Sequence, residues 1–172
     1  MHASDSGRPA PDARIGGANW ASFEVAAPDL AAAGRRMFDR DGTGEALLAT
    51  VRGDAPPRIH PINLAIVGDG LYAFLLASAK RRDLELDGRY ALHAHQDPAA
   101  PSEFSVRGHA RRVDDPEVRA TVGSAWSFEV DESYALFEFS IASVLLGIRD
   151  GPDAWPPRYT RWTVSGPAPS PS

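Results

Sequence analysis

The 172-residue sequence contains no cysteine and only one lysine. The lack of cysteine excludes disulfides, Cys-ligated zinc, iron–sulfur clusters and a thiol nucleophile. No apolar run approaches the ~20 residues that a membrane span needs, and the N-terminus lacks the apolar segment of a signal peptide. We therefore expect a cytoplasmic protein without a membrane partner.

Positive charge is also scarce, because 18 Lys and Arg against 23 Asp and Glu give a net charge of −5. This balance argues against a nucleic-acid partner. A hydrophobic content of 43% and a charged content of 24% are typical of a globular chain, and the length suits one domain with a sizeable core.

Several common catalytic and nucleotide-binding motifs are absent as well. The sequence has no Gly-x-Gly-x-x-Gly, no Walker loop and no Gly-x-Ser-x-Gly. No pair of carboxylates stands out from the scattered acidic residues. We therefore assign no catalytic acid or base.

The apolar and turn-forming residues predict a mainly β protein with flanking helices. Residues 1–19 and 166–172 are rich in Gly, Pro, Ala and Ser, so we expect a flexible arm and a flexible tail around a domain of residues 20–165. Successive strands joined by hairpins favour an antiparallel barrel over a doubly wound parallel sheet. Helices are expected over 28–38, 79–86 and 115–126, and strands over 45–52, 58–67, 71–77, 90–96, 104–113, 134–141, 144–149 and 158–164.

The only lysine, Lys80, lies at the predicted start of the short helix 79–86. Ser78 can cap this helix by accepting from the backbone N–H of Lys80 or Arg81. Free N–H groups, the helix dipole and the cations Lys80, Arg81 and Arg82 together suit a phosphate. The alternative is a capped helix followed by a solvated basic turn.

The strand over 58–67 carries a second candidate surface. Arg58 and His60 share one of its faces, while Ile59, Pro61 and Asn63 share the other. Pro61 has no N–H, so the strand should be an edge or irregular there, where a ligand could reach free backbone groups. A flat heteroaromatic ring would use such a surface, or Arg58 and His60 simply form the polar outer face of a hairpin.

Two further groups of residues have both a functional and a structural interpretation. His93 and His95 share a strand face and, with His60 and His109, could hold a metal ion, although no acidic residue stands at a matching spacing. The segment 155–162 holds two Trp, one Tyr and two Arg, which could stack on a cofactor or a partner subunit, or close the core.

The sequence resembles the pyridoxamine 5′-phosphate oxidase-related family of flavin-binding split barrels over about residues 20–164. The resemblance depends on the order and spacing of short motifs: 49–51, 57–62, 69–72, 78–84, 88–92 and 108–110. Ala79 replaces the central Arg of the Ser-Arg-Lys found in pyridoxamine phosphate oxidases, and their C-terminal Arg-x-His-x-Arg is missing. The resemblance therefore does not extend to oxidation of vitamin B6.

The resemblance implies a six-stranded antiparallel split barrel that is a homodimer with its cofactor at the subunit interface. It implies FMN as cofactor, with the 8-hydroxy-5-deazaflavin cofactor and haem as alternatives. The strand from Arg58 to Asn63 would lie under the isoalloxazine ring, Ser78 and Lys80 would hold the phosphate, and Arg161 and Trp162 would reach cofactor or substrate. The implied function is an oxidoreductase acting on a small organic substrate, or a non-catalytic flavin- or haem-binding storage protein.

Overall fold

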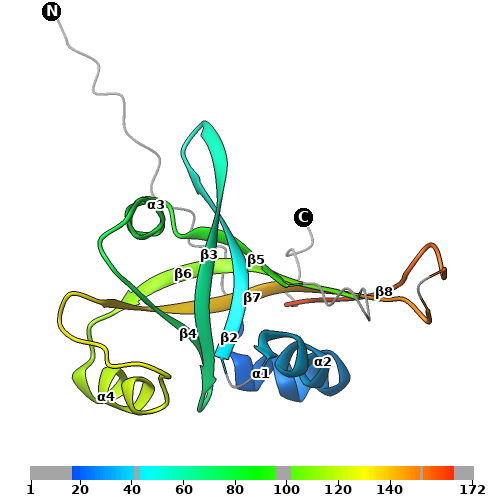
Figure 1. The fold of residues 1–172 in the computed structure, drawn as a ribbon, viewed down its shortest axis with the longest axis horizontal. Helices are drawn as coiled ribbons and strands as arrows, with labels where there is room; N and C mark the ends of the chain where they lie inside the picture. The colour runs from blue at the N-terminus through cyan, green and yellow to red at the C-terminus, as the bar shows by residue number, and fades with distance from the viewer. Residues whose placement is uncertain (1–16, 41–42, 96–101, 152, 165–172) are drawn as a thin grey trace, which may run out of the picture.

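The computed structural model describes residues 17–40, 43–95, 102–151 and 153–164 (Figure 1). The helices are α1 (Trp20–Ala26), α2 (Pro28–Phe38), α3 (Ala79–Leu86) and α4 (Pro116–Ser124). The strands are β1 (Asp39–Arg40), β2 (Thr43–Arg52), β3 (Ala55–Val67), β4 (Gly70–Leu75), β5 (Arg89–Ala94), β6 (Glu103–Val113), β7 (Ala135–Ile148) and β8 (Arg158–Thr163).

The expected terminal arm and tail fall almost entirely outside the described residues. Of the predicted arm over 1–19, only residues 17–19 are described. Ala18 forms an isolated antiparallel bridge with Ile141, with backbone hydrogen bonds of 2.9 and 2.8 Å.

Six strands close into an antiparallel barrel, as expected. The order is β2-β3-β4-β7-β6-β5, and β5 pairs with β2 to complete the circle. Strands β1 and β8 extend this barrel by pairing with β2 and β7. In Figure 1, α3 lies on one side of the barrel, and α1, α2 and α4 lie on the other.

The barrel is split between β3 and β4. Strand β3 pairs with β2 from Leu64 back to Ala55, but with β4 only over Ala65–Val67. Most of β3 therefore has one hydrogen-bonding edge without a strand partner. Pro61 lies within this open stretch, which confirms the expected edge position.

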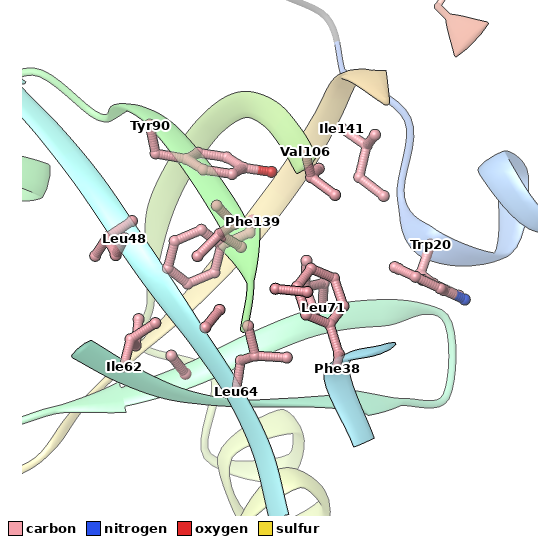
Figure 2. Close-up of a cluster of buried hydrophobic side chains, with 14 of the residues drawn as sticks. Trp20, Phe38, Leu48, Ile62, Leu64, Leu71, Tyr90, Val106, Phe139 and Ile141 are labelled. Carbon is pink, nitrogen blue, oxygen red and sulfur yellow. The ribbon is translucent and has the colours of Figure 1, made fainter. Parts of the chain in front are cut away.

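The barrel interior and the inner faces of α1 and α2 form one hydrophobic core (Figure 2). Alternating residues of β2 and β3, such as Leu48, Ile62 and Leu64, point inward and are buried. Phe38 packs edge-on against Phe104 at a ring-centroid distance of 5.3 Å. The aromatic filling explains how a small barrel closes without an internal channel.

The predicted and observed secondary structures differ most at α1 and β7. Helix α1 was not expected; Asn19 caps it by accepting from the backbone N–H of Ser22, and Trp20 and Phe23 are buried one turn apart. The two strands expected over 134–141 and 144–149 are one strand, β7. It stays continuous because β6 pairs with it from Leu136 to Gly147, across one register irregularity, while β8 pairs with Ser143–Ile148.

Gly108 marks an irregular point in the β6–β7 pairing and provides a test of this packing. A Cβ there would overlap the carbonyl oxygen of Ser140. The backbone at Ser140 would have to shift to make room. We therefore expect Gly108→Ala to lower the free energy of unfolding by about 3 kcal/mol, which is the upper end of the usual cost of overpacking a core. Gly151→Ala is the control, since a Cβ at Gly151 meets nothing within 4 Å. Equal urea midpoints for the two variants would contradict this description of the strand pair.

Candidate functional site

A cleft of about 490 Å³ opens where the barrel is split. Its walls come from the open edge of β3, the end of β4, the start of α3 and the segment between α4 and β7. The lining residues are Pro61, Ile62, Asn63, Phe74, Leu75, Leu76, Ala77, Ser78, Lys80, Phe128 and Tyr134. Four of the ten residues expected from the sequence to bind a cofactor, Pro61, Asn63, Ser78 and Lys80, therefore meet in one place.

Lys80 is the cation of this cleft. Its Nζ donates a hydrogen bond of 2.5 Å to the carbonyl oxygen of Pro61, and no described carboxylate lies within ion-pair distance of it. Burial lowers the pKa of Lys80 because the charged form loses hydration. The cleft thus holds a partly desolvated positive charge that has no negative partner among the described residues.

The geometry of Pro61 shows why this carbonyl is available. The N and C=O of one strand residue point to the same side, so the Pro61 nitrogen also faces the opening. Pro61 is the register partner of Leu47 on β2. Because its nitrogen faces away from β2, the missing N–H does not remove a hydrogen bond between the two strands. Proline here keeps a backbone acceptor at the open edge without leaving a donor unpaired.

Ser78 caps α3 as the sequence predicts. Its Oγ accepts from the backbone N–H of Arg81 at 3.4 Å and donates to the carbonyl of Leu76 at 3.0 Å. The N–H groups of Ala79 and Lys80 belong to the first helical turn, which has no acceptor within the helix. This end of α3 therefore offers backbone donors beside the Lys80 ammonium group.

Asp83 attaches α3 to the barrel. Its carboxylate accepts a hydrogen bond of 3.0 Å from the Thr50 hydroxyl on β2 and lies 3.7 Å from the Arg58 guanidinium on β3. Only 2% of Asp83 is exposed. Because Lys80 precedes Asp83 by three residues, the two side chains lie on one face of the helix. Docking Asp83 on the barrel therefore directs Lys80 toward β3.

Arg58 and His60 lie on the half-buried side of β3, under α3, and not on an outer face. Burial lowers the pKa of His60, and the nearby charges of Lys80 and Arg58 act in the same direction against the opposing effect of Asp83. The buried His60 Nε2 has no hydrogen-bond partner among the described residues. Neutral imidazole is thus the favoured form in the folded protein.

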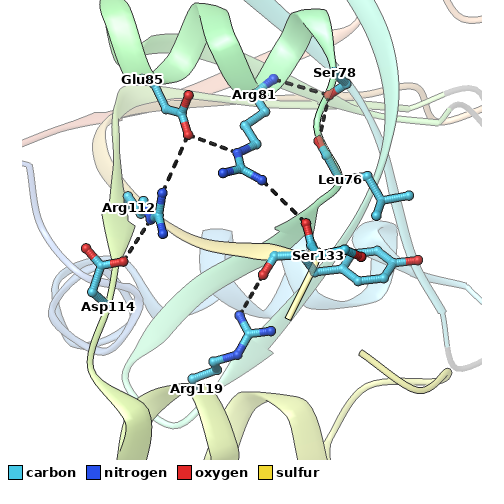
Figure 3. A network of polar contacts seen from close by, with 9 residues as sticks. Leu76, Ser78, Arg81, Glu85, Arg112, Asp114, Arg119 and Ser133 are labelled. Carbon is cyan, nitrogen blue, oxygen red and sulfur yellow. Dashed lines mark hydrogen bonds and ion pairs between the residues drawn. The ribbon is translucent and has the colours of Figure 1, made fainter. Parts of the chain in front are cut away.

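Arg81 points away from the phosphate position that the sequence suggested for it. Its guanidinium pairs with Glu85 at 2.9 Å and approaches the carbonyl oxygen of Ser133 at 3.4 Å (Figure 3). Arg82 is exposed and is not among the residues that line the cleft. Of the three consecutive cations, Lys80 is the one that reaches the cleft.

The remaining expected residues lie on the outer surface of the barrel. Ile59 lines a cleft of about 700 Å³, together with His93 and His95. Arg161 and Trp162 line a neighbouring cleft of about 140 Å³. Within one chain, these three residues do not meet Lys80 and Ser78.

The described histidines do not form the metal site considered from the sequence. In the part of the chain that the structure describes, no group of three His, Asp or Glu side chains could hold a metal ion. His93 Nε2 lies 3.8 Å from Glu103, and His109 packs against Gly88.

None of the described helices is long and apolar enough to cross a membrane.

Four important side chains were not recognised from the sequence. Asp83 looks like part of a solvated charged helix, and Thr50 looks like an ordinary strand residue. Phe128 and Tyr134 lie about fifty residues beyond α3 in the chain, so only tertiary structure brings them to the cleft. Asp83 could have been found from its spacing, because a residue three positions after Lys80 lies on the same face of the helix.

The fold is that of the pyridoxamine 5′-phosphate oxidase-like split-barrel proteins. A haem-binding protein from Mycobacterium smegmatis is similar with a TM-score of 0.58 and 17% identity, over 77% of this chain and 57% of that chain. PhzG from Burkholderia lata 383, in complex with tetrahydrophenazine-1-carboxylic acid, has a TM-score of 0.55 and 14% identity, over 84% and 85%. The haem storage protein HutZ from Vibrio cholerae has a TM-score of 0.52 and 17% identity, over 67% and 89%.

These similarities concern the fold, because the sequences have diverged widely. No protein-family model and no curated protein matches the sequence. This chain also spans little more than half the length of the mycobacterial protein. The comparisons therefore establish the split-barrel fold of this chain, and its ligand has to be argued from the cleft itself.

His60 should make stability depend on pH. Its pKa in the folded state is below the ordinary value of 6.5, so the unfolded chain takes up the proton first as the pH falls. We expect the free energy of unfolding to decrease as the pH falls below about 6.5, and His60→Asn to show a smaller decrease. Urea unfolding of both proteins across this range measures the difference. Parallel pH profiles would show that His60 is not the group responsible.

Proposed function

We propose that this protein is an FMN-binding oxidoreductase that acts on a small organic substrate. The observation that carries the proposal is the combination found in the split of the barrel. One cleft joins a partly desolvated lysine and a helix start, which suit a phosphate, to an open strand edge and apolar walls, which suit a flat ring.

The phosphate end of the cofactor fits the start of α3. Phosphate oxygens would accept hydrogen bonds from Lys80 and from the first backbone N–H groups of the helix. Lys80 would then exchange its bond to the Pro61 carbonyl for a charge-assisted bond. The desolvation that lowers the pKa of Lys80 would be offset by an anion, which supports an anionic ligand here.

The ring end of the cofactor fits the edge of β3. Leu76, which is 47% exposed, and Phe128, which is 39% exposed, provide apolar surface. The exposed Asn63 amide can donate to a ring carbonyl or accept from a ring N–H. Bound FMN supplies the hydride or electron transfer, and these residues bind and orient it. A deazaflavin shares the flat ring system and remains the second form of this proposal.

A second candidate function is haem binding without turnover. It is favoured by the imidazoles of His93 and His95 beside the large, mainly apolar cleft on the outer face, because haem iron accepts imidazole ligands. Adding hemin and FMN separately to ligand-free protein distinguishes the two candidates. A saturable haem spectrum that disappears in His93→Ala and His95→Ala, together with no response to FMN, would favour haem.

We further propose that the protein is a homodimer whose subunits meet across the outer-face cleft around Ile59. Ile59 is 70% exposed and Leu47 is 37% exposed, next to Ala49, Ala91 and Leu145. Such an apolar surface is self-complementary when a two-fold axis passes through it. A second copy would also offer Arg161 and Trp162, which one chain keeps apart from its own Lys80, to a shared cofactor site.

Lys80→Ala tests the phosphate position. Loss of a charge-assisted hydrogen bond costs roughly 1.5–3 kcal/mol, so FMN affinity should fall on the order of ten- to a hundredfold. Riboflavin has the same ring without the phosphate, so its affinity should hardly change. Calorimetric titration of both ligands measures the two effects.

The control for this variant is Arg82→Ala, which removes the same charge from an exposed neighbouring position. It should leave both affinities nearly unchanged. If Lys80→Ala weakens FMN and riboflavin equally, or leaves FMN binding intact, the phosphate does not bind at the start of α3.

Ile59→Arg tests the dimer. A charged side chain in the centre of the proposed apolar interface should leave mainly monomer at micromolar concentration, because two copies of it would meet near the two-fold axis. Val25→Arg is the matched control, since Val25 is 87% exposed on α1, away from this face. Light scattering gives both masses, and a monomeric wild type would refute the proposed interface.

A further inference from the structure

One wall of the cleft comes from the segment 125–134, which connects α4 to β7. Its residues Phe128 and Tyr134 line the cleft together with Ser78 and Lys80. Phe128 is 39% exposed, and Leu76, which also lines the cleft, is 47% exposed. Large apolar side chains thus remain uncovered where a ligand would lie, although the core is close by.

The wall continues a row of aromatic rings that begins in the core. Trp126 packs edge-on against the buried Phe74 at 5.1 Å and against Phe128 at 6.1 Å. Phe128 in turn lies 5.8 Å from Tyr134, with the rings tilted by 49°. Each ring limits the orientation of the next, so the exposed ring is held by the buried one.

Two arginines attach the backbone of this segment to neighbouring helices. Arg119 of α4 donates to the carbonyls of Tyr134 at 2.8 Å and Asp131 at 2.6 Å, and its guanidinium covers the Phe74 ring at 5.1 Å. Arg81 of α3 donates to the carbonyl of Ser133 at 3.4 Å (Figure 3). The segment is therefore connected both to α4 and to the helix that carries Lys80.

We propose that Phe128 and Tyr134 form a specificity wall that selects flat aromatic rings for this cleft, and that Arg81 and Arg119 are positioning residues that hold it. The inference rests on the proposed flavin site and adds what selects the ring of its ligand. It also gives Arg81 a role different from phosphate binding. An aromatic ring of the ligand packs against Phe128 and Tyr134, while its anionic end lies at Lys80.

The wall is tested with Tyr134→Leu, which removes the ring and keeps an apolar side chain. FMN and riboflavin should both bind roughly three- to tenfold more weakly, because both use the ring. Trp155→Leu, at an aromatic residue that is 77% exposed and outside the cleft lining, is the control and should change neither affinity. Phe128→Leu provides the same test if Tyr134→Leu does not fold.

The positioning role is tested with Arg81→Gln against Arg82→Gln, which lose the same charge one residue apart. In ligand-free protein, Arg81→Gln should speed hydrogen exchange in the segment 125–134, and Arg82→Gln should not. Arg81→Gln should also weaken FMN and riboflavin by the same factor, whereas loss of a phosphate ligand would weaken only FMN.

The possible outcomes separate this inference from the function on which it rests. Suppose that wild type binds both flavins, but that Tyr134→Leu has the same flavin affinities as Trp155→Leu. Suppose also that Arg81→Gln has the same flavin affinities and hydrogen-exchange rates as Arg82→Gln. The specificity wall is then refuted and the flavin site stands. Selective loss of FMN in Arg81→Gln refutes the positioning role. Wild type that binds neither flavin refutes the proposed function and this inference together.

Discussion

The buried carboxylate of Asp83 determines where α3 lies, and the candidate site depends on that position. Asp83 joins the helix to β2 through Thr50 and to β3 through Arg58, which are register partners across the hairpin. A carboxylate that is almost fully buried is costly unless such partners accompany it, so the helix has one strongly preferred docking position. Lys80, three residues earlier, is thereby directed at the open edge of β3.

Barrel closure creates that open edge. Strand β2 pairs with both β3 and β5, which holds the β2–β3 pair in the barrel wall. Strands β3 and β4, in contrast, pair over only three residue pairs and then separate. The split exposes backbone groups that an ordinary barrel would pair, and Lys80 satisfies one of them at Pro61. Burial of the Lys80 ammonium group carries a desolvation cost, which an anion bound beside it would offset.

Much of the fold follows from local sequence signals. The bounds of α2 and α3, the Ser78 cap and the open edge at Pro61 all agree with expectation, because capping residues and proline act over a few residues. The continuity of β7 and the burial of Asp83 could not be predicted in this way, since they depend on partners far away in the chain. For the same reason, the sequence grouped Arg81 with Lys80, whereas the fold turns it toward Ser133.

The absorption spectrum of protein purified without an affinity tag shows whether the split in the barrel is a flavin site, as proposed. We expect a flavin spectrum, either as isolated or after addition of FMN and removal of the excess, and release of FMN on denaturation. Protein that remains colourless after incubation with FMN, or that carries a haem spectrum and takes up no flavin, would contradict the claim.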